Sequence, residues 1–562
     1  MFLRTTSQKR KDGSKLTHVQ LAESYWNPDK RRSDTRIIFN CGRADDPKVI
    51  DRLKRLAASI QRRYSPEEIV GGDGSWRLLD AWPYGHLYVL EALWKRLGIR
   101  AILERMAADR RFTFSIERAL FVMVANRVCA PKSKLYCWEQ WLREDVRIDD
   151  TETLELQHLY RAMDFLEANK DELEREIFFS VSDLLNLDVE LIFYDTTSVH
   201  FEVDVEDTGD DDGTVHGSEA AGGKVYKAPR KRGHSKNGRS DAPQIVVGMA
   251  VTRDGFPVRH WVFEGNTVDV TTVARVKEEL RGWRLTRCVF VGDSGMVSED
   301  NLKTLSRGGG KYIVCMPMRR GKEVAEQVLG RAGRYQEVAD NLRVKEVVVG
   351  DGERRRRYVV CHNPEEEKRQ RKHRDHVVAE LEAELSSLQD LSGARHTKRV
   401  CKLRTSRRYG KYLRETKTGK LRLDKAKIKA AAKFDGKFVV HSNDDSLTAE
   451  DMALGYKQLM RVEEAWRTMK SGLDLRPVFH RVAHRIHAHV AITVLALLLQ
   501  RVAEHACDDT WRNIRDDLRQ VKLAQLSSPD GEVWQVTEPR EEAVNRLKLL
   551  ELDNPPAVRA LR

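Results

Sequence analysis

The sequence lacks an apolar run long enough to cross a lipid bilayer. Its longest, Val490–Leu499, is predicted to be part of a buried helix. Residues 1–13 contain no apolar core of the kind an export signal needs, so we expect no secretion. The eight cysteines form no CxxC pair and keep no regular spacing, which disfavours a zinc or disulfide framework and indicates reduced thiols. These absences predict a cytoplasmic protein with no membrane partner.

Positive charge is what the chain has in excess. Of its 562 residues, 99 are Lys or Arg and 86 are Asp or Glu, which gives a net charge of +13 and a pI near 9.2. A hydrophobic content of 41% is enough for several globular domains with sizeable cores. The basic balance indicates a polyanionic partner.

The excess is concentrated between residues 395 and 433, where sixteen Lys or Arg stand against two acids. An inert surface normally mixes both signs of charge, so this stretch is predicted to bind a phosphate backbone. A solvated surface without a partner is the alternative. Tyr409 and Tyr412 interleave with the basic residues. The residues expected to contact phosphate are Lys402, Arg404, Arg407, Arg408 and Lys411.

Two short apolar runs each end on an aspartate. Leu191–Tyr194 is rich in residues typical of a strand buried on both faces, and it ends at Asp195. Cys288–Gly292 has the same character and ends at Asp293. A buried carboxylate needs a cation or hydrogen bonds to compensate its charge, although an aspartate can also simply cap a turn. Two of them in one α/β chain predict a shared divalent metal site.

The order of apolar patterns divides the chain into segments. From the Asp195 strand onward the expected order is strand, strand, strand, helix, strand with Asp293, helix, strand. Within it, the acidic loop 204–223 and the basic loop 227–243 are too polar to be expected to pack. The segments are 1–70, a small β-hairpin plus helix unit; 77–186, entirely helical; 187–317, the first part of an α/β core; 318–437, a basic insertion; 438–505, the second part of the core; and 506–562, a helical tail with a short strand at 532–537.

The helical segment 77–186 carries basic residues that we expect either to touch phosphate or to form a solvated helix face: Arg127, Lys132 and Lys134.

Residues 449–470 are predicted to form one helix region with two distinct stripes. Three residues, Tyr456, Glu463 and Lys470, are spaced seven apart and therefore share one face. Glu463 could instead form an ordinary surface ion pair with Arg467, four residues on. The expected core stripe is Val462, Trp466, Met469 and Leu473.

These motifs, taken in order, resemble the DDE transposases of bacterial insertion sequences. The resemblance is strongest to the branch whose helix carries a Tyr-x2-Arg-x3-Glu-x6-Lys signature, here YKQLMRVEEAWRTMK at 456–470. Leu459 occupies the arginine position, with Arg461 two residues along. The stretches FYDTTSVHFE, GHSKNGRSDAPQIVVGMAVTRDGFPV, VFEGNTVD and VGDSGMVSEDNL are also similar to that family, and the likeness covers about 190–316 and 435–500.

The resemblance implies a ribonuclease H-like α/β core, interrupted by the basic insertion and preceded by a small β unit and a helical, DNA-binding domain. It implies that Asp195, Asp293 and Glu463 hold two Mg²⁺ or Mn²⁺ ions per active site for phosphodiester hydrolysis and strand transfer. It also implies double-stranded DNA partners (element ends and target DNA), a homodimer in a synaptic complex with each site completed in trans, and a bacterial cytoplasmic, nucleoid-associated location. The signature residues expected to bind DNA are Tyr456, Arg461, Arg467 and Lys470.

Three other functions fit parts of the sequence. A nuclease of the same fold would use the same three acids without strand transfer. A catalytically silent DNA-binding protein is disfavoured by the complete set of acids. A zinc site at His480, His484 and His487 has helical spacing, but it lacks a nearby fourth ligand and is surrounded by arginines that would repel a cation.

Overall fold

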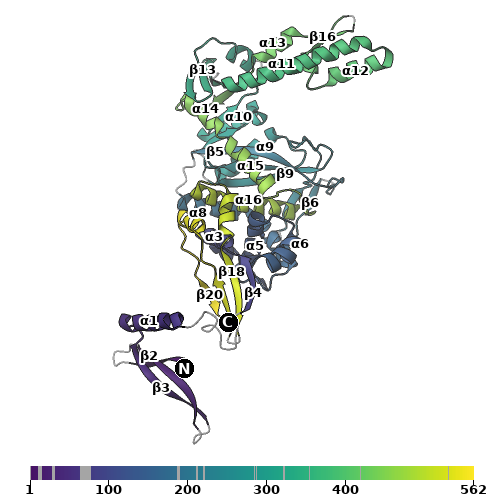
Figure 1. Ribbon diagram of the computed structural model, residues 1–562. Helices are drawn as coiled ribbons and strands as arrows, with labels where there is room; N and C mark the ends of the chain where they lie inside the picture. The colour runs from purple at the N-terminus through teal and green to yellow at the C-terminus, as the bar shows by residue number, and fades with distance from the viewer. Residues whose placement is uncertain are drawn as a thin grey trace. The chain divides into compact units, whose positions relative to one another are not determined.

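The computed structural model of the protein forms two compact units (Figure 1). One consists of Met1–Trp82, Lys522–Glu538 and Pro556–Arg562, and the other of Pro83–Val521 and Pro539–Pro555. The structure describes residues 2–9, 15–27, 32–63, 77–185, 190–210, 213–218, 222–283, 285, 288–319, 323–352, 355–417, 419–528 and 531–561.

The first unit contains two antiparallel sheets. In one, three strands in the order β1-β2-β3 precede helix α1, so the expected hairpin and helix are confirmed and a third strand is added. The other has the order β20-β19-β18-β4. The elements are β1 Phe2–Lys9, β2 Lys15–Asn27, β3 Arg32–Arg43, α1 Pro47–Arg63, β4 Arg77–Pro83, β18 Lys522–Ser528, β19 Gly531–Val536 and β20 Val558–Leu561.

The second of these sheets corrects two sequence predictions. Residues 77–83 are a strand rather than the start of a helical segment, and the tail beyond 506 contributes three strands rather than one. Trp82 stacks on Trp534 with ring centroids 5.6 Å apart. The local sequence of such a strand gives little indication of its structure, because pairing with strands hundreds of residues away is what stabilises it.

In the second unit, residues 85–184 are helical, as expected. Helix α5 is buried almost all round because it packs against α7 and the long helix α16. The elements are α3 Gly85–Arg96, α4 Ile99–Ala107, α5 Ile116–Cys129, α6 Lys134–Tyr136, a π-helical turn Cys137–Asp145, α7 Leu156–Ala168, α8 Lys170–Leu184, α16 Ala483–Cys507, α17 Trp511–Leu518 and α18 Glu541–Leu549.

Both expectations for the basic residues of this segment are wrong at Arg127 and Lys134. Each side chain is buried, so neither faces solvent or is open to phosphate. Arg127 donates to the carbonyl oxygens of Leu473 at 3.3 Å and Asp474 at 3.0 Å. Burial lowers the pKa of Arg127 to about 10 and that of Lys134 to about 7. Arg127 thus anchors the chain just beyond the predicted signature helix.

A nine-stranded mixed sheet forms the centre of this unit, in the order β12-β13-β14-β17-β11-β10-β5-β8-β9. Strand β10 runs parallel to β5 and β11, and β8 and β9 continue the sheet antiparallel. The expected order of elements is confirmed, with a small β6–β7 hairpin added. The elements are β5 Leu191–His200, β6 Thr214–His216, β7 Val225–Lys227, β8 Gln244–Val251, β9 Pro257–Glu264, α9 Asp269–Gly282, β10 Val289–Gly292, α10 Glu299–Ser306 and β11 Lys311–Cys315.

Where the structure describes them, the polar loops between β5 and β8 are joined by charged contacts. Arg230 is hydrogen-bonded to Asp207 across the two loops, and Arg232 to Glu206. The prediction that these loops do not pack therefore missed their complementarity, because acidic and basic stretches that look unstructured separately can neutralise one another.

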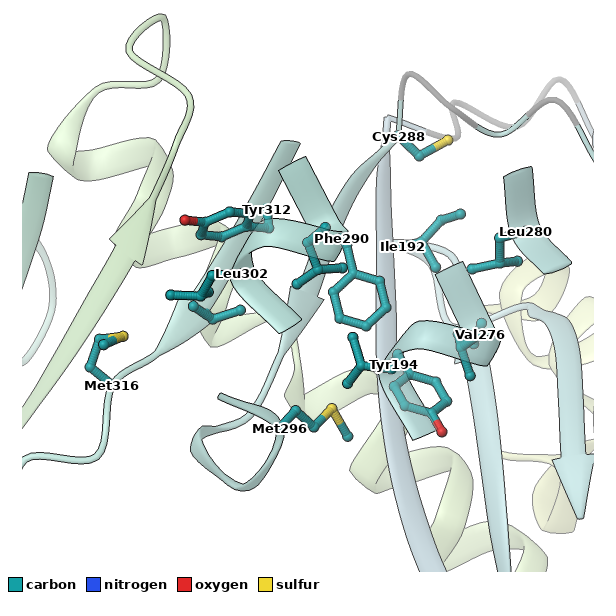
Figure 2. Packing of buried hydrophobic residues seen from close by; sticks show 14 of the residues in the cluster. Ile192, Tyr194, Val276, Leu280, Cys288, Phe290, Met296, Leu302, Tyr312 and Met316 are labelled. Carbon is teal, nitrogen blue, oxygen red and sulfur yellow. The ribbon is translucent and has the colours of Figure 1, made fainter. Parts of the chain in front are cut away.

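Apolar side chains fix the residue that precedes Asp195. Tyr194 packs against Trp261 and Phe290, and Figure 2 shows Tyr194 and Phe290 side by side in the cluster between the sheet and its helices. The Tyr194 hydroxyl donates to Thr272 Oγ1 of α9 at 3.0 Å. The strand therefore cannot slip in register without breaking both packing and a buried hydrogen bond.

The basic insertion has two parts. Its strands β12, β13 and β14 extend the central sheet, because β14 pairs with β17. The rest forms an arm of helices with a small core of its own, visible as α11 beside α12 in Figure 1. The elements are β12 Gln336–Ala339, β13 Leu342–Val349, β14 Arg356–His362, α11 Pro364–Ser387, α12 Gly393–Thr405, β15 Leu413–Glu415, β16 Leu421–Leu423, α13 Lys425–Ala432 and β17 Lys437–Ser442.

Helix α16 contains the long apolar run and is buried, as predicted. By length and composition it could cross a membrane, but 89% of its most apolar window lies inside the protein. No disulfide joins any of the eight cysteines, all of which lie among the described residues.

A buried carboxylate joins α16 to α7. Asp164 accepts two hydrogen bonds from Arg485, at 2.9 and 3.0 Å, and lies 3.3 Å from His484 Nε2. Burial alone would raise the pKa of Asp164, but the hydrogen bonds from His484 and Arg485 outweigh it and hold the pKa at about 2.

Asp164→Asn should lower the free energy of unfolding at pH 7 by roughly 2 kcal/mol. The folded-state pKa lies below its usual value near 4, so the contribution is present above about pH 4 and is lost as the pH falls towards 2. The gap between wild type and variant, measured by denaturant unfolding, should therefore close over that range. Asp254→Asn, at the exposed β8–β9 turn, is the control; a gap that persists unchanged at pH 2 would contradict the assignment.

Candidate active site

The sheet register places Asp195 and Asp293 side by side. Tyr194 pairs with Gly292 in the parallel β5–β10 ladder, and each aspartate is the next residue. The expectation that Asp195 ends its strand is wrong, since β5 continues to His200 against β8. Strand β10 ends at Gly292, whereas β5 continues beyond Asp195. From Asp195 onward, β5 therefore has no strand beside it on the β10 side, and both carboxylates lie at this open edge of the sheet.

Burial dominates the electrostatics of Asp195. The pKa of its carboxyl is raised to about 6, chiefly by burial, with smaller contributions from the charges of Asp269 and Asp293 and against the opposing effects of Lys236 and a backbone hydrogen bond. The Lys236 Nζ lies 3.8 Å from Asp195 Oδ1, beyond hydrogen-bond distance. The site thus holds more negative charge than the nearby side chains neutralise.

Tyr456 reaches Asp293 from helix α14, Ala449–Lys457. Its hydroxyl donates to Asp293 Oδ1 at 3.1 Å, and its ring lies 5.5 Å from that of Phe438. Burial raises the pKa of Tyr456 far above its usual value, and Cys315 and Asp293 add to this. Tyr456 therefore stays a neutral hydrogen-bond donor that orients the Asp293 carboxylate.

Lys470 reaches the other side of the site. Its Nζ donates to Thr197 Oγ1 on β5 and to Asn237 Oδ1 at 3.1 Å. The pKa of Lys470 is lowered to about 8, chiefly by burial and also by the charges of Arg476 and Lys236, while Asp195 opposes them. The ammonium is therefore close to the Asp195 carboxylate without being paired to it.

The helix between these two residues is interrupted, which corrects the sequence prediction of one continuous face. α14 ends at Lys457, α15 runs from Met460 to Arg467, and a π-helical turn covers Thr468–Gly472. At the break, Leu459 N donates to Tyr456 O and Val462 N to Leu459 O, so the chain tightens to three-residue bonding. The core stripe Val462, Trp466, Met469 and Leu473 is buried, as predicted.

Glu463 stands apart from the two aspartates. It lies on the exposed side of α15, whose buried side packs against β5 and β8. Its carboxylate makes no hydrogen bond or ion pair within the part of the chain that the structure describes. Among those same residues, no three His, Cys, Asp or Glu side chains are grouped closely enough to hold a metal ion. The structure thus brings together two of the three predicted ligands.

The remaining predicted DNA contacts are spread over two surfaces. On α15, Arg461 pairs with Glu464 at 3.3 Å, and Arg467 is exposed. On the arm, Arg404 pairs with Glu415 at 3.2 Å and Arg408 with Glu380. Lys402, Arg407 and Lys411 are exposed, whereas Tyr412 is buried in the core of the arm and Tyr409 is partly buried against it.

Sequence reasoning missed two charged residues at the site, Asp269 and Lys236. Asp269, the first residue of α9, accepts hydrogen bonds from Thr196 Oγ1 at 2.5 Å and from Lys236 Nζ at 2.9 Å. Asp269 and Lys236 belong to two stretches of the family resemblance, VFEGNTVD and GHSKNGRSD, to which no role was given. Only the fold brings them to β5.

The histidines of the zinc alternative contact different partners. His484 lies 3.3 Å from Asp164, His487 lies 3.5 Å from Glu167, and the His480 ring packs edge-on against Tyr160. They make three separate structural contacts rather than one ligand set.

Comparison with known families decides the identity. A model of the transposase DDE domain matches residues 210–499, more than half of the chain. The chain belongs to the DDE transposases. A second model, the N-terminal domain of IS1634 family transposases, matches residues 3–68 of this transposase. The first match includes Asp293 and Glu463 and begins after Asp195. Enzymes of the DDE family generally depend on divalent metal ions.

Other comparisons add little. Among curated proteins there is no match. The solved structure of a piggyBac transposase synaptic complex with hairpin DNA shares 9% identity with this transposase over 83% of this chain and 79% of that chain, at a TM-score of 0.33. Similarity at that level carries no weight for the fold.

Glu464→Gln should keep a substantial fraction of DNA cleavage, whereas Glu463→Gln, nearly isosteric, should lose it. Neighbouring helical residues point about 100° apart, and Glu464 is engaged by Arg461. Cleavage of element-end DNA in Mg²⁺ and in Mn²⁺ measures both variants, the second ion guarding against a site that is only weakened. If Glu464→Gln is the inactive variant, the assignment of Glu463 is wrong.

Proposed function

We propose that this transposase cuts the ends of its insertion sequence and joins them to target DNA with two divalent metal ions held by Asp195, Asp293 and Glu463. The observation that carries the proposal is the pair of aspartates at the open edge of β5 and β10. Bound there, the ions would activate the attacking water or 3′-hydroxyl and stabilise the leaving oxygen.

The sheet topology supports a ribonuclease H-like core. Its five strands, β9-β8-β5-β10-β11, combine an antiparallel β5–β8–β9 meander with parallel β5, β10 and β11. Helix α9 connects β9 to β10 and α10 connects β10 to β11. The insertion then separates this part from α14 and α15.

The side chains present fit hard divalent cations. Carboxylate oxygens are the donors that Mg²⁺ and Mn²⁺ take in proteins. Burial is the main cause of the raised pKa of Asp195, and a bound dication would offset the cost of that buried carboxylate charge. The donor set therefore favours the metal chemistry of the family.

The surroundings of Glu463 support its role as the third ligand. Tyr456 and Lys470, seven residues to either side, contact Asp293 and the strand beside Asp195. The segment that carries Glu463 therefore spans the site. The Glu463 carboxylate would need to turn inward to join those of Asp195 and Asp293. Tyr456 would orient Asp293, and Lys470 would bind a phosphate of the DNA.

The partners follow from the same function. We propose double-stranded DNA, both element ends and target, bound by a homodimer in a synaptic complex with sites completed in trans. The location would be the bacterial cytoplasm, at the nucleoid. The arm would supply affinity for the phosphate backbone through its exposed Lys and Arg side chains, independently of the DNA sequence.

Asp195→Ala, Asp293→Ala and Glu463→Ala should each abolish cleavage while leaving binding to element ends largely intact, because metal ligation serves the chemistry and affinity rests on other contacts. A gel-shift assay run beside cleavage and strand-joining assays tests this. Wild-type cleavage by any one variant would remove that residue from the site. Cleavage by wild type without joining would favour a nuclease.

Reversing the charges of Lys402 and Arg407 together should make the plot of log K against log salt shallower by about one unit per lost phosphate contact. Both side chains are exposed on the arm and free of acidic partners among the described residues. The matched control is Lys548→Glu on α18. An unchanged slope in the double variant would mean that the arm is a solvated surface.

A further inference from the structure

A short segment crosses β5 beside Asp195 and brings an unassigned lysine to the site. We call residues 235–239 the strap. Lys236 N donates to Ser198 Oγ at 2.9 Å, and Asn237 Nδ2 donates to the Ser198 carbonyl at 2.6 Å. Arg239 N closes the strap on Ser235 Oγ at 3.1 Å. The strap is thereby fixed to the strand three residues beyond Asp195.

The Lys236 side chain occupies the open edge of the sheet beyond the end of β10. Its Nζ donates to the Thr196 carbonyl at 2.8 Å and to Thr196 Oγ1 at 2.7 Å, and it pairs with Asp269 Oδ2 at 2.9 Å. Asp195 Oδ1 is farther, at 3.8 Å. The side chain remains 35% exposed. The amine is therefore held by contacts with β5 and α9. It remains accessible to solvent beside Asp195 and Asp293.

The strap also connects this amine to the second one. Asn237 accepts a hydrogen bond from Lys470 Nζ at 3.1 Å while it donates to β5. Lys236 and Lys470 are thus hydrogen-bonded to consecutive residues of β5, Thr196 and Thr197, and the charge of Lys236 acts on Lys470. The charge of Asp195 opposes this repulsion at Lys470, so the two amines are held beside the carboxylates of the site.

Nearby carboxylates engage the two amines to different extents. Asp269 is engaged on both oxygens, by Thr196 and Lys236. Lys470 has no carboxylate partner among the residues that the structure describes. Lys236 does not reach hydrogen-bond distance of Asp195. A phosphodiester, with two non-bridging oxygens and one negative charge, matches a pair of amines set beside a metal site.

We propose that Lys236 is a second phosphate-binding residue of the active site, acting with Lys470 on the DNA phosphate next to the reacting one. Asp269 and Asn237 are positioning residues that aim the two amines. The inference rests on the proposed function and adds to it a specific contact with a phosphate of the DNA strand. The alternative is that Lys236 only balances the charge of Asp195.

Binding without divalent metal separates these accounts. The probe is a duplex carrying a pre-cleaved element end, titrated in EDTA at several salt concentrations. Lys236→Gln should make the salt slope shallower by about 0.9, the value for one lost phosphate contact. Lys236→Arg should retain the slope. Arg239→Gln, on the same strap but paired with Asp241 and Glu202, is the matched control and should equal wild type.

Cleavage kinetics supply a second readout. Lys236→Gln should raise KM for the end duplex and slow cleavage, and Lys236→Arg should restore part of both. Asp269→Asn keeps the charge of Lys236 but frees the amine, so it should raise KM while leaving the salt slope unchanged. This variant also decides the matter if Lys236→Gln fails to fold, as judged by circular dichroism, because a wild-type KM in Asp269→Asn would overturn the positioning role.

The failure of this inference can be told from failure of the proposed function. Wild type and Asp195→Asn serve as references, the first active and the second inactive with an unchanged slope. If wild type neither binds nor cuts element ends, the proposed function fails. If both references behave as expected but Lys236→Gln keeps the wild-type slope and KM, only the phosphate role of Lys236 is wrong. A Lys236→Gln variant with altered Mn²⁺ affinity and an unchanged slope would assign Lys236 to charge balance alone.

Discussion

Burial of the Asp195 carboxylate among other acids is the constraint on which the site depends. A central strand of a sheet normally carries apolar residues, and β5 does so up to Tyr194. Asp195 breaks that rule at the point where β10 ends, and Asp269 and Asp293 add to its repulsion. Such an arrangement is unfavourable for stability and persists because the surrounding packing holds β5 in register.

The compensation is assembled from segments far apart in the chain. Lys236 comes from the strap, Tyr456 from the end of α14, and Lys470 from the π-helical turn. Arg127, buried in the helical segment, holds the carbonyl groups of Leu473 and Asp474 just past that turn. The helical segment therefore has a structural role at the site through a basic residue that is buried rather than exposed.

The sequence predicts those elements whose own residues carry a recognisable hydrophobic pattern. The apolar runs that precede Asp195 and Asp293, the buried stripe of α15 and the buried α16 each carry their own hydrophobic pattern, and the structure has them, although β5 continues past Asp195 to His200. The break at Leu459 could not be seen, because a helix tightened to three-residue bonding keeps nearly the same spacing of buried residues. Lys236 and Asp269 were equally hidden, since their importance arises only when the strap and α9 meet β5. β4 needed partners from the far end of the chain.

The base of the arm shows how this core accommodates extra sequence. Asn363 N donates to the Gly436 carbonyl at 2.7 Å, so the chain leaves the sheet after β14 and returns to it at β17 through one point. Because the two ends already meet, the entropy of closing the excursion grows only slowly with its length. A change in the length of the arm would therefore cost little closure entropy and would leave the β14–β17 ladder, and the sheet that carries the carboxylates, in place.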